Sequence, residues 1–233
     1  MLHTVEAYPF EPGSLTKMTE AGELFSRYPA YRSCVAWISE FVARHDPRIN
    51  RPGPVCPHIA GAMNRDLIWL VSIPTDGWSV DEAVEKGRYL ADLYHALFTE
   101  PGEFRGGSLL AFFPGVPDEH AGAFIDAGHR RLRMEFIRRG LMLGEFHPAS
   151  QVGSVRNPEF KVMRSPAPMF AVRALTTHDL MFLDTPQTAA GDRLEYLEHY
   201  LRYVGGRIGP AVADRAGRRM RAAEEELQRG TQS

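Results

Sequence analysis

The residues best suited to chemistry follow an apolar run in the second half of the chain. This run, Gly140 to Phe146, contains Glu145 and leads into His147 and Pro148. A proline disfavours helical backbone at the residue before it, so we expect His147 to leave the end of a strand. Its imidazole could serve as an axial iron ligand or as a general base, and we expect Glu145 to orient it through a neighbour. A histidine that only hydrogen-bonds to backbone is the simpler alternative.

A second candidate is Cys56-Pro57-His58, which lies at the end of a proline-rich segment at residues 46–57. A cysteine thiolate could ligate iron or act as a nucleophile, whereas a buried thiol is inert. His58 could share one metal ion with His147 if the fold brings the two rings together. The prolines predict a rigid loop without regular structure over this segment.

Two arginines, Arg164 and Arg173, flank a Ser-Pro-Ala-Pro turn and an apolar strand. A charge in such surroundings needs a partner, and an arginine binds carboxylates best through two parallel hydrogen bonds. The partner could be an internal carboxylate, a substrate carboxylate or a porphyrin propionate. The other arginines, and lone histidines such as His129, are interpreted as solvated surface or cap residues. Phe146 and the other aromatic residues suit a core or a flat apolar cofactor equally well.

Periodicity predicts the elements that position these residues. Helices are expected at residues 33–45, 80–98, 118–139, 192–204 and 211–229, and strands at residues 67–73, 108–113, 141–146 and 169–175. This order, with a hairpin formed by the last two strands, predicts an α/β (α+β) single domain whose mixed or largely antiparallel sheet is covered by helices. We expect an N-terminal arm over residues 1–32, a globular domain over residues 33–208 and a charged helix or tail over residues 209–233, which could fray.

Composition excludes several classes of protein. The chain has 233 residues, a formal net charge of -2, 44% apolar residues and two cysteines. Two cysteines argue against a disulfide scaffold and favour the cytoplasm, and neither a secretion signal nor a membrane span is expected. The charge gives no general attraction to nucleic acid or membranes. We therefore expect a small-molecule partner, no nucleic acid and no membrane, and leave a homodimer open.

Several of these segments together resemble an uncharacterised bacterial domain family whose members often lie near natural-product genes. The resemblance covers roughly residues 50–185 and implies no activity. It is carried by Cys56-Pro57, the Gly-Glu-Phe-His-Pro signature at residues 144–148, the arginine-flanked turn at residues 164–173 and Asp179-Leu180-x-Phe182-Leu183. A fainter pattern, with a cysteine–proline pair, a Phe-Pro strand end and an Asn-Pro loop, is similar to heme-dependent amino-acid N-oxygenases, although Cys56-Pro57 reverses the usual order.

The second resemblance implies heme b. His147 would be the metal ligand, with Phe146 beside the cofactor and Arg164 or Arg173 on a propionate or a substrate carboxylate. Cys56 and His58 would line the distal side. The leading hypothesis is thus a heme-dependent oxygenase of specialised metabolism acting on an amino acid or a small amine or aromatic derivative.

Two alternatives stay open. One is a cofactor-free enzyme in which His147 and Glu145 do acid–base work, and the other is a non-catalytic binding or scaffold protein of a biosynthetic cluster. A pocket that holds one histidine with arginines at its rim would favour heme. A filled core around His147 would favour the scaffold.

Overall fold

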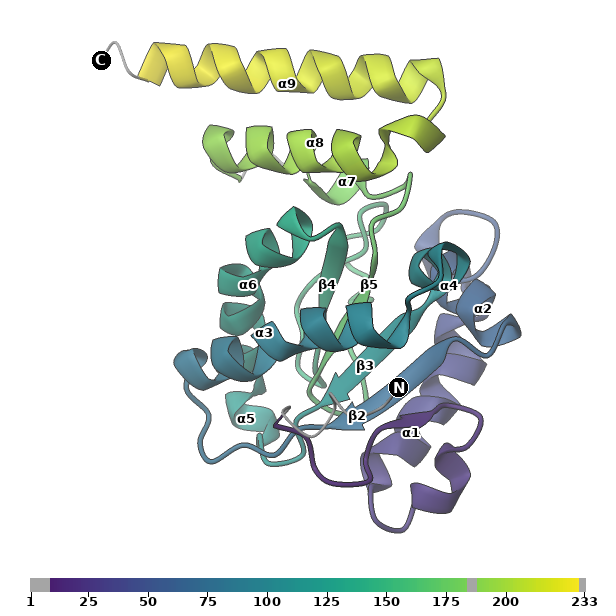
Figure 1. The fold of residues 1–233 in the computed structure, drawn as a ribbon. Coiled ribbons are helices and arrows are strands. Elements are labelled where there is room, and N and C mark those ends of the chain that lie inside the picture. The colour runs from purple at the N-terminus through teal and green to yellow at the C-terminus, as the bar shows by residue number, and fades with distance from the viewer. Residues whose placement is uncertain (1–8, 184–187, 231–233) are drawn as a thin grey trace. The chain divides into compact units, whose positions relative to one another are not determined.

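The computed structural model divides the chain into two compact units. Unit 1 comprises residues 1–132 and 143–173, and unit 2 comprises residues 133–142 and 174–233. The structure describes residues 9–183 and 188–230. Each unit is described by itself (Figure 1). Within the described residues, no helix combines the length and the apolar character needed to cross a bilayer.

A five-stranded mixed sheet in the order β1-β2-β3-β5-β4 forms the centre of unit 1. Its strands are β1 (Thr16–Lys17), β2 (Ile68–Ser72), β3 (Ser108–Phe112), β4 (Leu141–Phe146) and β5 (Met169–Ala174), the last two of which continue into unit 2. β2 and β3 are parallel, whereas β1–β2 and β3–β5 are antiparallel. The predicted mixed sheet, the α+β class and the pairing of the last two strands are therefore confirmed.

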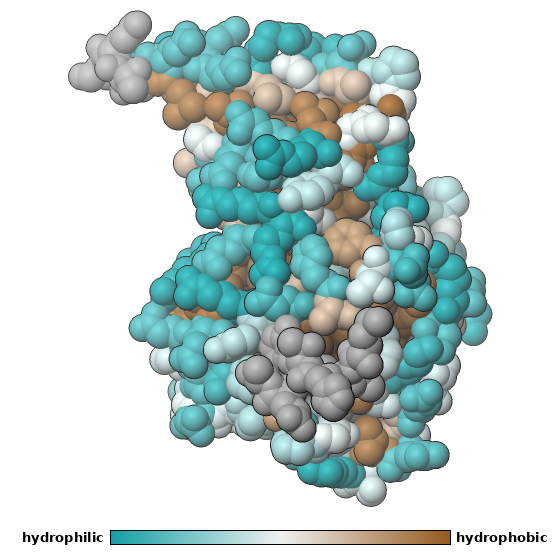
Figure 2. Space-filling view, viewed as in Figure 1, coloured by the Kyte–Doolittle hydropathy of each residue, from teal (hydrophilic) through white to brown (hydrophobic). Residues whose placement is uncertain are grey.

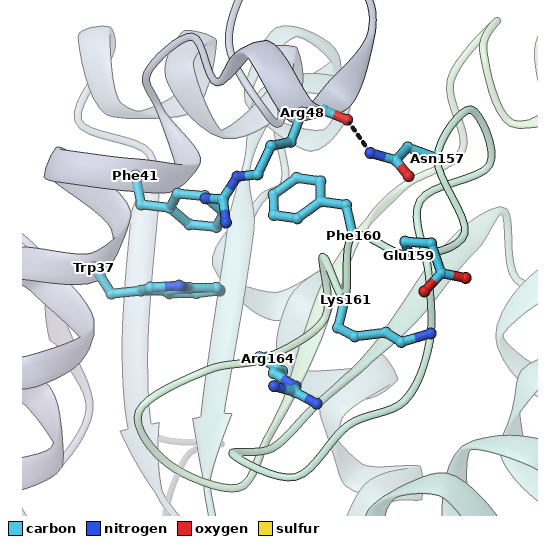
Figure 3. A pocket seen from close by; sticks show the side chains of 8 residues that line it. All are labelled: Trp37, Phe41, Arg48, Asn157, Glu159, Phe160, Lys161 and Arg164. Atoms are coloured by element: carbon cyan, nitrogen blue, oxygen red, sulfur yellow. Dashed lines mark hydrogen bonds between the residues drawn. The ribbon is translucent and has the colours of Figure 1, made fainter.

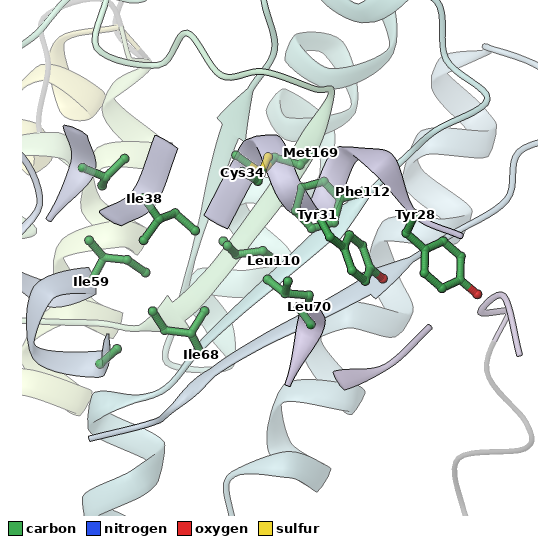
Figure 4. Packing of buried hydrophobic residues seen from close by; sticks show 13 residues of the cluster. Tyr28, Tyr31, Cys34, Ile38, Ile59, Ile68, Leu70, Leu110, Phe112 and Met169 are labelled. Carbon is green, nitrogen blue, oxygen red and sulfur yellow. The ribbon is translucent and has the colours of Figure 1, made fainter. Parts of the chain in front are cut away.

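The sheet is covered by helices on both of its faces. Every residue of β3 is buried, as expected for a central strand with two covered faces. On one face lie α1 (Pro29–Trp37), η3 (Ile38–Val42) and α2 (Pro57–Asn64). Their apolar side chains pack with those of Leu70, Leu110 and Phe112 in a continuous core (Figure 4). Tyr31 and Phe112 illustrate the packing, with ring centroids 5.1 Å apart.

The opposite face is covered by one long helix and a segmented one. These are α3 (Val80–Leu97), followed later by α5 (Asp118–Ala121), η5 (Gly122–Asp126) and α6 (Ala127–Arg138). Phe113 contacts both Phe124 and Phe170 here, at ring-centroid distances of 5.1 and 5.3 Å. A Cβ added at Gly128 would lie 2.7 Å from that of Ala83, so glycine allows the close approach of α3 and α6. Ser79 caps α3, accepting a hydrogen bond from the Glu82 N–H.

Two predicted helices contain a π-helical turn, which the sequence pattern does not show. The predicted helix at residues 33–45 consists of α1 followed by the π-helix η3, and the one at residues 118–139 contains the π-helix η5. π-helical turns are rare and occur frequently at functional sites. η3 contributes Phe41 and η5 contributes Asp126 to the two regions described below.

Short elements were also missed by periodicity. These are β1, η2 (Ala21–Leu24), η4 (Pro47–Ile49), α2 and α4 (Pro101–Gly106). The prediction of no regular structure over residues 46–57 was wrong at η4, where Asp46 caps one turn of 3₁₀ helix and Pro47 occupies its first position. Proline suits that position because its missing N–H would have no helical partner there.

Unit 2 is a helical layer made of α7 (Leu180–Leu183), α8 (Ala190–Val204), η6 (Gly205–Arg207) and α9 (Pro210–Gly230) with the end of α6. Apolar side chains fill the seam between α8 and α9, and the outer face of α9 is hydrophilic (Figure 2). Ala216 and Ala223 on α9 are buried. The C-terminal helix thus packs against α8 instead of standing free in solvent, while residues 231–233 lie outside the described residues.

Candidate functional site

The end of β4 divides the predicted site residues between the two faces of the sheet. Successive strand residues point to opposite faces. Phe146, the last residue of β4, contacts the ring of Trp37 edge-on, with centroids 5.8 Å apart. His147 follows immediately and contacts Asp126 on η5 instead. The expectation that this histidine leaves the end of a strand is borne out by its place directly after β4.

His147 is enclosed by protein. Its residue is 2% exposed, and Nε2 lies 3.1 Å from Oδ1 of Asp126. Since a carboxylate only accepts, Nε2 carries the hydrogen, and Nδ1 has no hydrogen-bond partner among the described residues. A void large enough for a porphyrin would leave the ring edge accessible, so the packing around His147 has no room for heme beside it. A filled core around His147 is the arrangement expected for the non-catalytic scaffold alternative.

A second acid–histidine pair lies beside the first. Nδ1 of His129 contacts the carboxylate of Glu145, and its Nε2 lies 3.1 Å from the carbonyl oxygen of Leu143. The His129 ring thus lies between a carboxylate and a backbone carbonyl oxygen. Glu145 therefore has its own histidine, and the interpretation of His129 as a surface or cap residue was wrong. Asp126 ends η5, and His129 lies three residues later in α6. Glu145 lies in β4, and His147 directly follows that strand. The two pairs therefore join the same helical segment to the same strand end.

An open pocket of about 500 Å³ lies on the other side of the strand end (Figure 3). One part of its lining is aromatic, one part is cationic, and the rest is an amide and a carboxylate. The lining residues are Trp37, Phe41, Phe160, Arg48, Lys161, Arg164, Asn157 and Glu159. Trp37 and Phe41 come from α1 and η3, Arg48 comes from η4, and the others come from the loop between β4 and β5.

This loop is anchored by backbone contacts at the strand end. The carbonyl oxygen of His147 accepts hydrogen bonds from the N–H groups of Ser150 and Ser165, at 3.2 and 3.4 Å. Further along the loop, the Asn157 amide donates to the carbonyl oxygen of Arg48 at 2.8 Å. His147 therefore holds the pocket loop through its backbone while its ring lies on the opposite face of the sheet.

The three pocket cations differ in their partners. Arg48 forms an ion pair with Asp46, whereas Arg164 donates to the carbonyl oxygen of Ser150 at 3.1 Å. Lys161 likewise donates to a carbonyl oxygen, that of Pro158, at 2.9 Å. In the part of the chain that the structure describes, neither Arg164 nor Lys161 forms an ion pair. The pocket thus presents two positive charges, those of Lys161 and Arg164, that form no ion pair with a carboxylate of the described residues.

The remaining predicted residues lie outside the pocket lining. Cys56 caps α2 at the edge of the core that includes Phe146, and His58 makes a 2.9 Å hydrogen bond with the carbonyl oxygen of Gly107. Arg173 is paired with Ser108 across β5 and β3. The structure therefore does not gather Cys56, His58 and Arg173 around the ring of His147. Cys34 is buried, and burial raises the pKa of its thiol to about 12, which makes it unreactive.

Sequence reasoning missed most of the pocket. Trp37 was considered only among the aromatic residues that suit a core or a flat cofactor equally well, and Phe41, Arg48 and Lys161 were not singled out as site residues. The signal available was the cluster of charged and aromatic residues at positions 157–164, Asn-Pro-Glu-Phe-Lys-Val-Met-Arg, within a long strand connection. Long ordered loops often carry function. What the sequence could not show is that residues 37–48 lie against it.

Comparison with known proteins identifies a family without an assigned activity. No curated protein and no solved structure matches the chain. The model of the Domain of unknown function (DUF6875) matches residues 31–215, which include the whole pocket and both acid–histidine pairs. The prediction of an uncharacterised domain family is thereby confirmed, with a longer extent than residues 50–185. The chain belongs to the DUF6875 family.

Proposed function

We propose that unit 1 binds a small molecule carrying both an aromatic ring and a carboxylate in the pocket between η3, η4 and the loop that follows β4. One observation supports this most directly: the lining combines an aromatic wall with two cations that have no ion-pair partner among residues 9–183 and 188–230. Cations left unpaired beside apolar surface favour an anionic ligand with a flat apolar part.

The aromatic wall suits a ring. Phe41 and Phe160 contact each other edge-on with centroids 6.0 Å apart, and Trp37 and Phe41 have centroids 6.3 Å apart. Rings spaced in this way offer both faces and edges to another ring. Trp37 is held in turn by Phe146, so the strand end supports the wall.

The cations suit a carboxylate. Lys161 and Arg164 extend from the loop on the side of the pocket away from Trp37 and Phe41 (Figure 3). A guanidinium binds a carboxylate through two parallel hydrogen bonds, and an ammonium adds a point charge. Glu159 also lines the pocket and would face an ammonium group, which supports an amino-acid-derived ligand.

The binding interpretation does not require His147 in the pocket. It corresponds to the non-catalytic alternative raised by the sequence, since the ring of His147 is packed on all sides. The heme-dependent oxygenase would require the atoms around that ring to move apart, so hemin belongs among the probes. We place the activity in the cytoplasm, which the free thiols of Cys34 and Cys56 support.

Isothermal titration with matched probes tests the proposal. 3-Phenylpropionate carries ring and carboxylate, 3-phenylpropanamide lacks the charge, and hexanoate lacks the ring. For a ligand of this size in an open pocket we expect a Kd of about 0.1–1 mM for 3-phenylpropionate and about tenfold weaker binding of the amide. L-Phenylalanine tests the role of Glu159, and hemin with His147→Ala tests the heme hypothesis by its Soret band.

Variants locate the site. Arg164→Gln combined with Lys161→Gln should weaken 3-phenylpropionate binding by about tenfold, since two exposed charged contacts of roughly 0.7 kcal/mol each together contribute about 1.4 kcal/mol. Arg156→Gln is the matched control, because Arg156 is exposed on the same loop and does not line the pocket. Equal binding of acid and amide, or no binding of any aromatic acid, would overturn the proposal. A Soret band lost in His147→Ala would establish heme in its place.

A further inference from the structure

Arg48 differs from the other two pocket cations because its charged edge is already used. Its Nε and Nη2 donate to the two carboxylate oxygens of Asp46, at 2.9 and 2.6 Å, in a bidentate pair. The backbone N–H of Arg48 donates to the same carboxylate at 2.9 Å. Arg48 also holds the pKa of the Asp46 carboxyl down at about 2, so this carboxylate stays ionised at neutral pH.

The guanidinium is also fixed in orientation. Its central carbon lies 4.4 Å from the ring centroid of Phe160, within cation–π range. Asn157 ties the backbone of Arg48 to the pocket loop. The Arg48 side chain is 61% exposed while that of Asp46 is 13% exposed, so part of the guanidinium remains available to a ligand. Arg48 therefore presents a flat surface whose charge is largely compensated.

We propose that Asp46 and Arg48 form a specificity-determining platform that selects a ring and leaves the ligand's carboxylate to Arg164 and Lys161. This inference rests on the proposed function of the pocket. A guanidinium whose N–H edge is paired can still stack its face on a ring. If its edge were free, it would instead attract any carboxylate, aromatic or aliphatic. Asp46 is thus a positioning residue that sets the preference for aromatic over aliphatic acids.

Asp46→Asn isolates the charge of the carboxylate. Asparagine is as good an N-cap as aspartate, so it can still accept from the Arg48 N–H while the ion pair is lost. Hexanoate should then bind about threefold more tightly, since a freed surface cation contributes up to roughly 1 kcal/mol. Binding of 3-phenylpropionate should change by less than about twofold, because the gain in charge is offset by a less well fixed platform.

Arg48→Met removes the platform and keeps a long apolar side chain. It should weaken 3-phenylpropionate by about threefold, the size of one exposed cation–π contact, and leave hexanoate nearly unchanged. Glu40→Gln is the control, because Glu40 is an exposed acid on η3 that does not line the pocket. A change of selectivity, measured as the ratio of the two affinities, would not arise from a merely structural role. Urea unfolding checks that each variant is folded.

The outcomes separate the two proposals. If the unsubstituted protein binds none of the aromatic acids, the proposed function fails, and the platform fails with it. If it binds them but Asp46→Asn and Arg48→Met both leave the affinity ratio unchanged, the platform alone is overturned. A lower ratio in both variants, with the control unchanged, supports it. If Asp46→Asn unfolds, Arg48→Met still decides, since a variant that keeps full preference for the ring contradicts the platform.

Discussion

The two faces of the sheet at the end of β4 carry similar residue types in opposite states. On the closed face, Asp126 pairs with His147 and Glu145 pairs with His129, and the His147 residue is 2% exposed. On the open face, aromatic rings and cations line a pocket of about 500 Å³. On the closed face each of these carboxylates contacts a histidine, whereas on the open face Lys161 and Arg164 form no ion pair within the described part of the chain.

This difference indicates where binding is to be expected. A charge that already has a partner gains little from a ligand, and an enclosed group cannot reach one. His147, which the sequence marks as the residue best suited to chemistry, is therefore enclosed at the strand end, where it pairs with Asp126. The loop residues that follow His147 are individually ordinary, but Lys161 and Arg164 among them line an open pocket and form no ion pair with the described residues.

The largest effect is expected from His147→Ala. It removes a buried ring, leaves Asp126 without its partner and opens a cavity, so we expect a loss of about 3 kcal/mol in the free energy of unfolding. Urea denaturation measures this loss. His178→Ala, at an exposed histidine, should change stability by less than about 0.5 kcal/mol. A variant with full stability that no longer binds the pocket ligand would show that the closed face belongs to the binding site.

Gly153→Ala should distort the loop that forms the pocket without changing any residue that lines it. A Cβ at this position would lie 2.3 Å from the carbonyl oxygen of Pro158 and 2.7 Å from its Cα, so the loop must shift. We expect about 2 kcal/mol of destabilisation, typical of overpacking, with weaker 3-phenylpropionate binding in titration. Gly61→Ala, where nothing lies within 4 Å, is the control and should be neutral or slightly stabilising. Unchanged affinity in Gly153→Ala would contradict a loop-built pocket.

The long periodic elements could be predicted from the sequence. The strands at residues 68–72 and 108–112 and the helix at residues 80–97 match their predicted bounds within two residues. These segments bury a continuous apolar run or a wide apolar stripe, which sets their period. Elements such as α2 and α4 are shorter than the window over which a period is visible, and their stability comes from packing.

The candidate site was less predictable because it depends on contacts between distant segments. Pro148 correctly indicated the strand end at His147, and Arg164, which the sequence analysis singled out, lines the pocket, while its role there stays a prediction. However, the π-helical turn of η5 sets the direction of Asp126, and no local pattern predicts such a turn. The roles of Trp37 and Arg48 likewise depend on a loop more than 100 residues away, as the contact between Asn157 and Arg48 shows.

A double-mutant cycle on His129 and Glu145 sharpens the description of the closed face. Their side chains are 15% and 16% exposed, so water screens the pair incompletely. We expect a coupling energy of about 1–2 kcal/mol between His129→Gln and Glu145→Gln, measured by urea unfolding of the two single variants and the double variant. The exposed pair of Arg131 and Asp81 gives the comparison and should couple by less than about 0.5 kcal/mol. Equal coupling in the two pairs would mean that the closed face is no more protected from water than the surface.

The smallest effect concerns the titration of Asp46, and it distinguishes the compensated cation of the open face from the uncompensated ones. Arg48 lowers the pKa of this carboxyl from 3.8 to about 2. Because the pKa is lower in the folded protein, the pair contributes stability above the ordinary value, and this contribution is lost as the pH falls toward 2. In a carboxyl-detected NMR titration, Asp46 should therefore titrate near pH 2 and return toward 3.8 in Arg48→Met, whereas Arg164→Gln should leave it unchanged. A midpoint near 3.8 for Asp46 in the unsubstituted protein would mean that Arg48 is as free to bind an anion as Arg164. The open face would then hold three equivalent cations instead of two unpaired cations and one platform formed by Asp46 and Arg48.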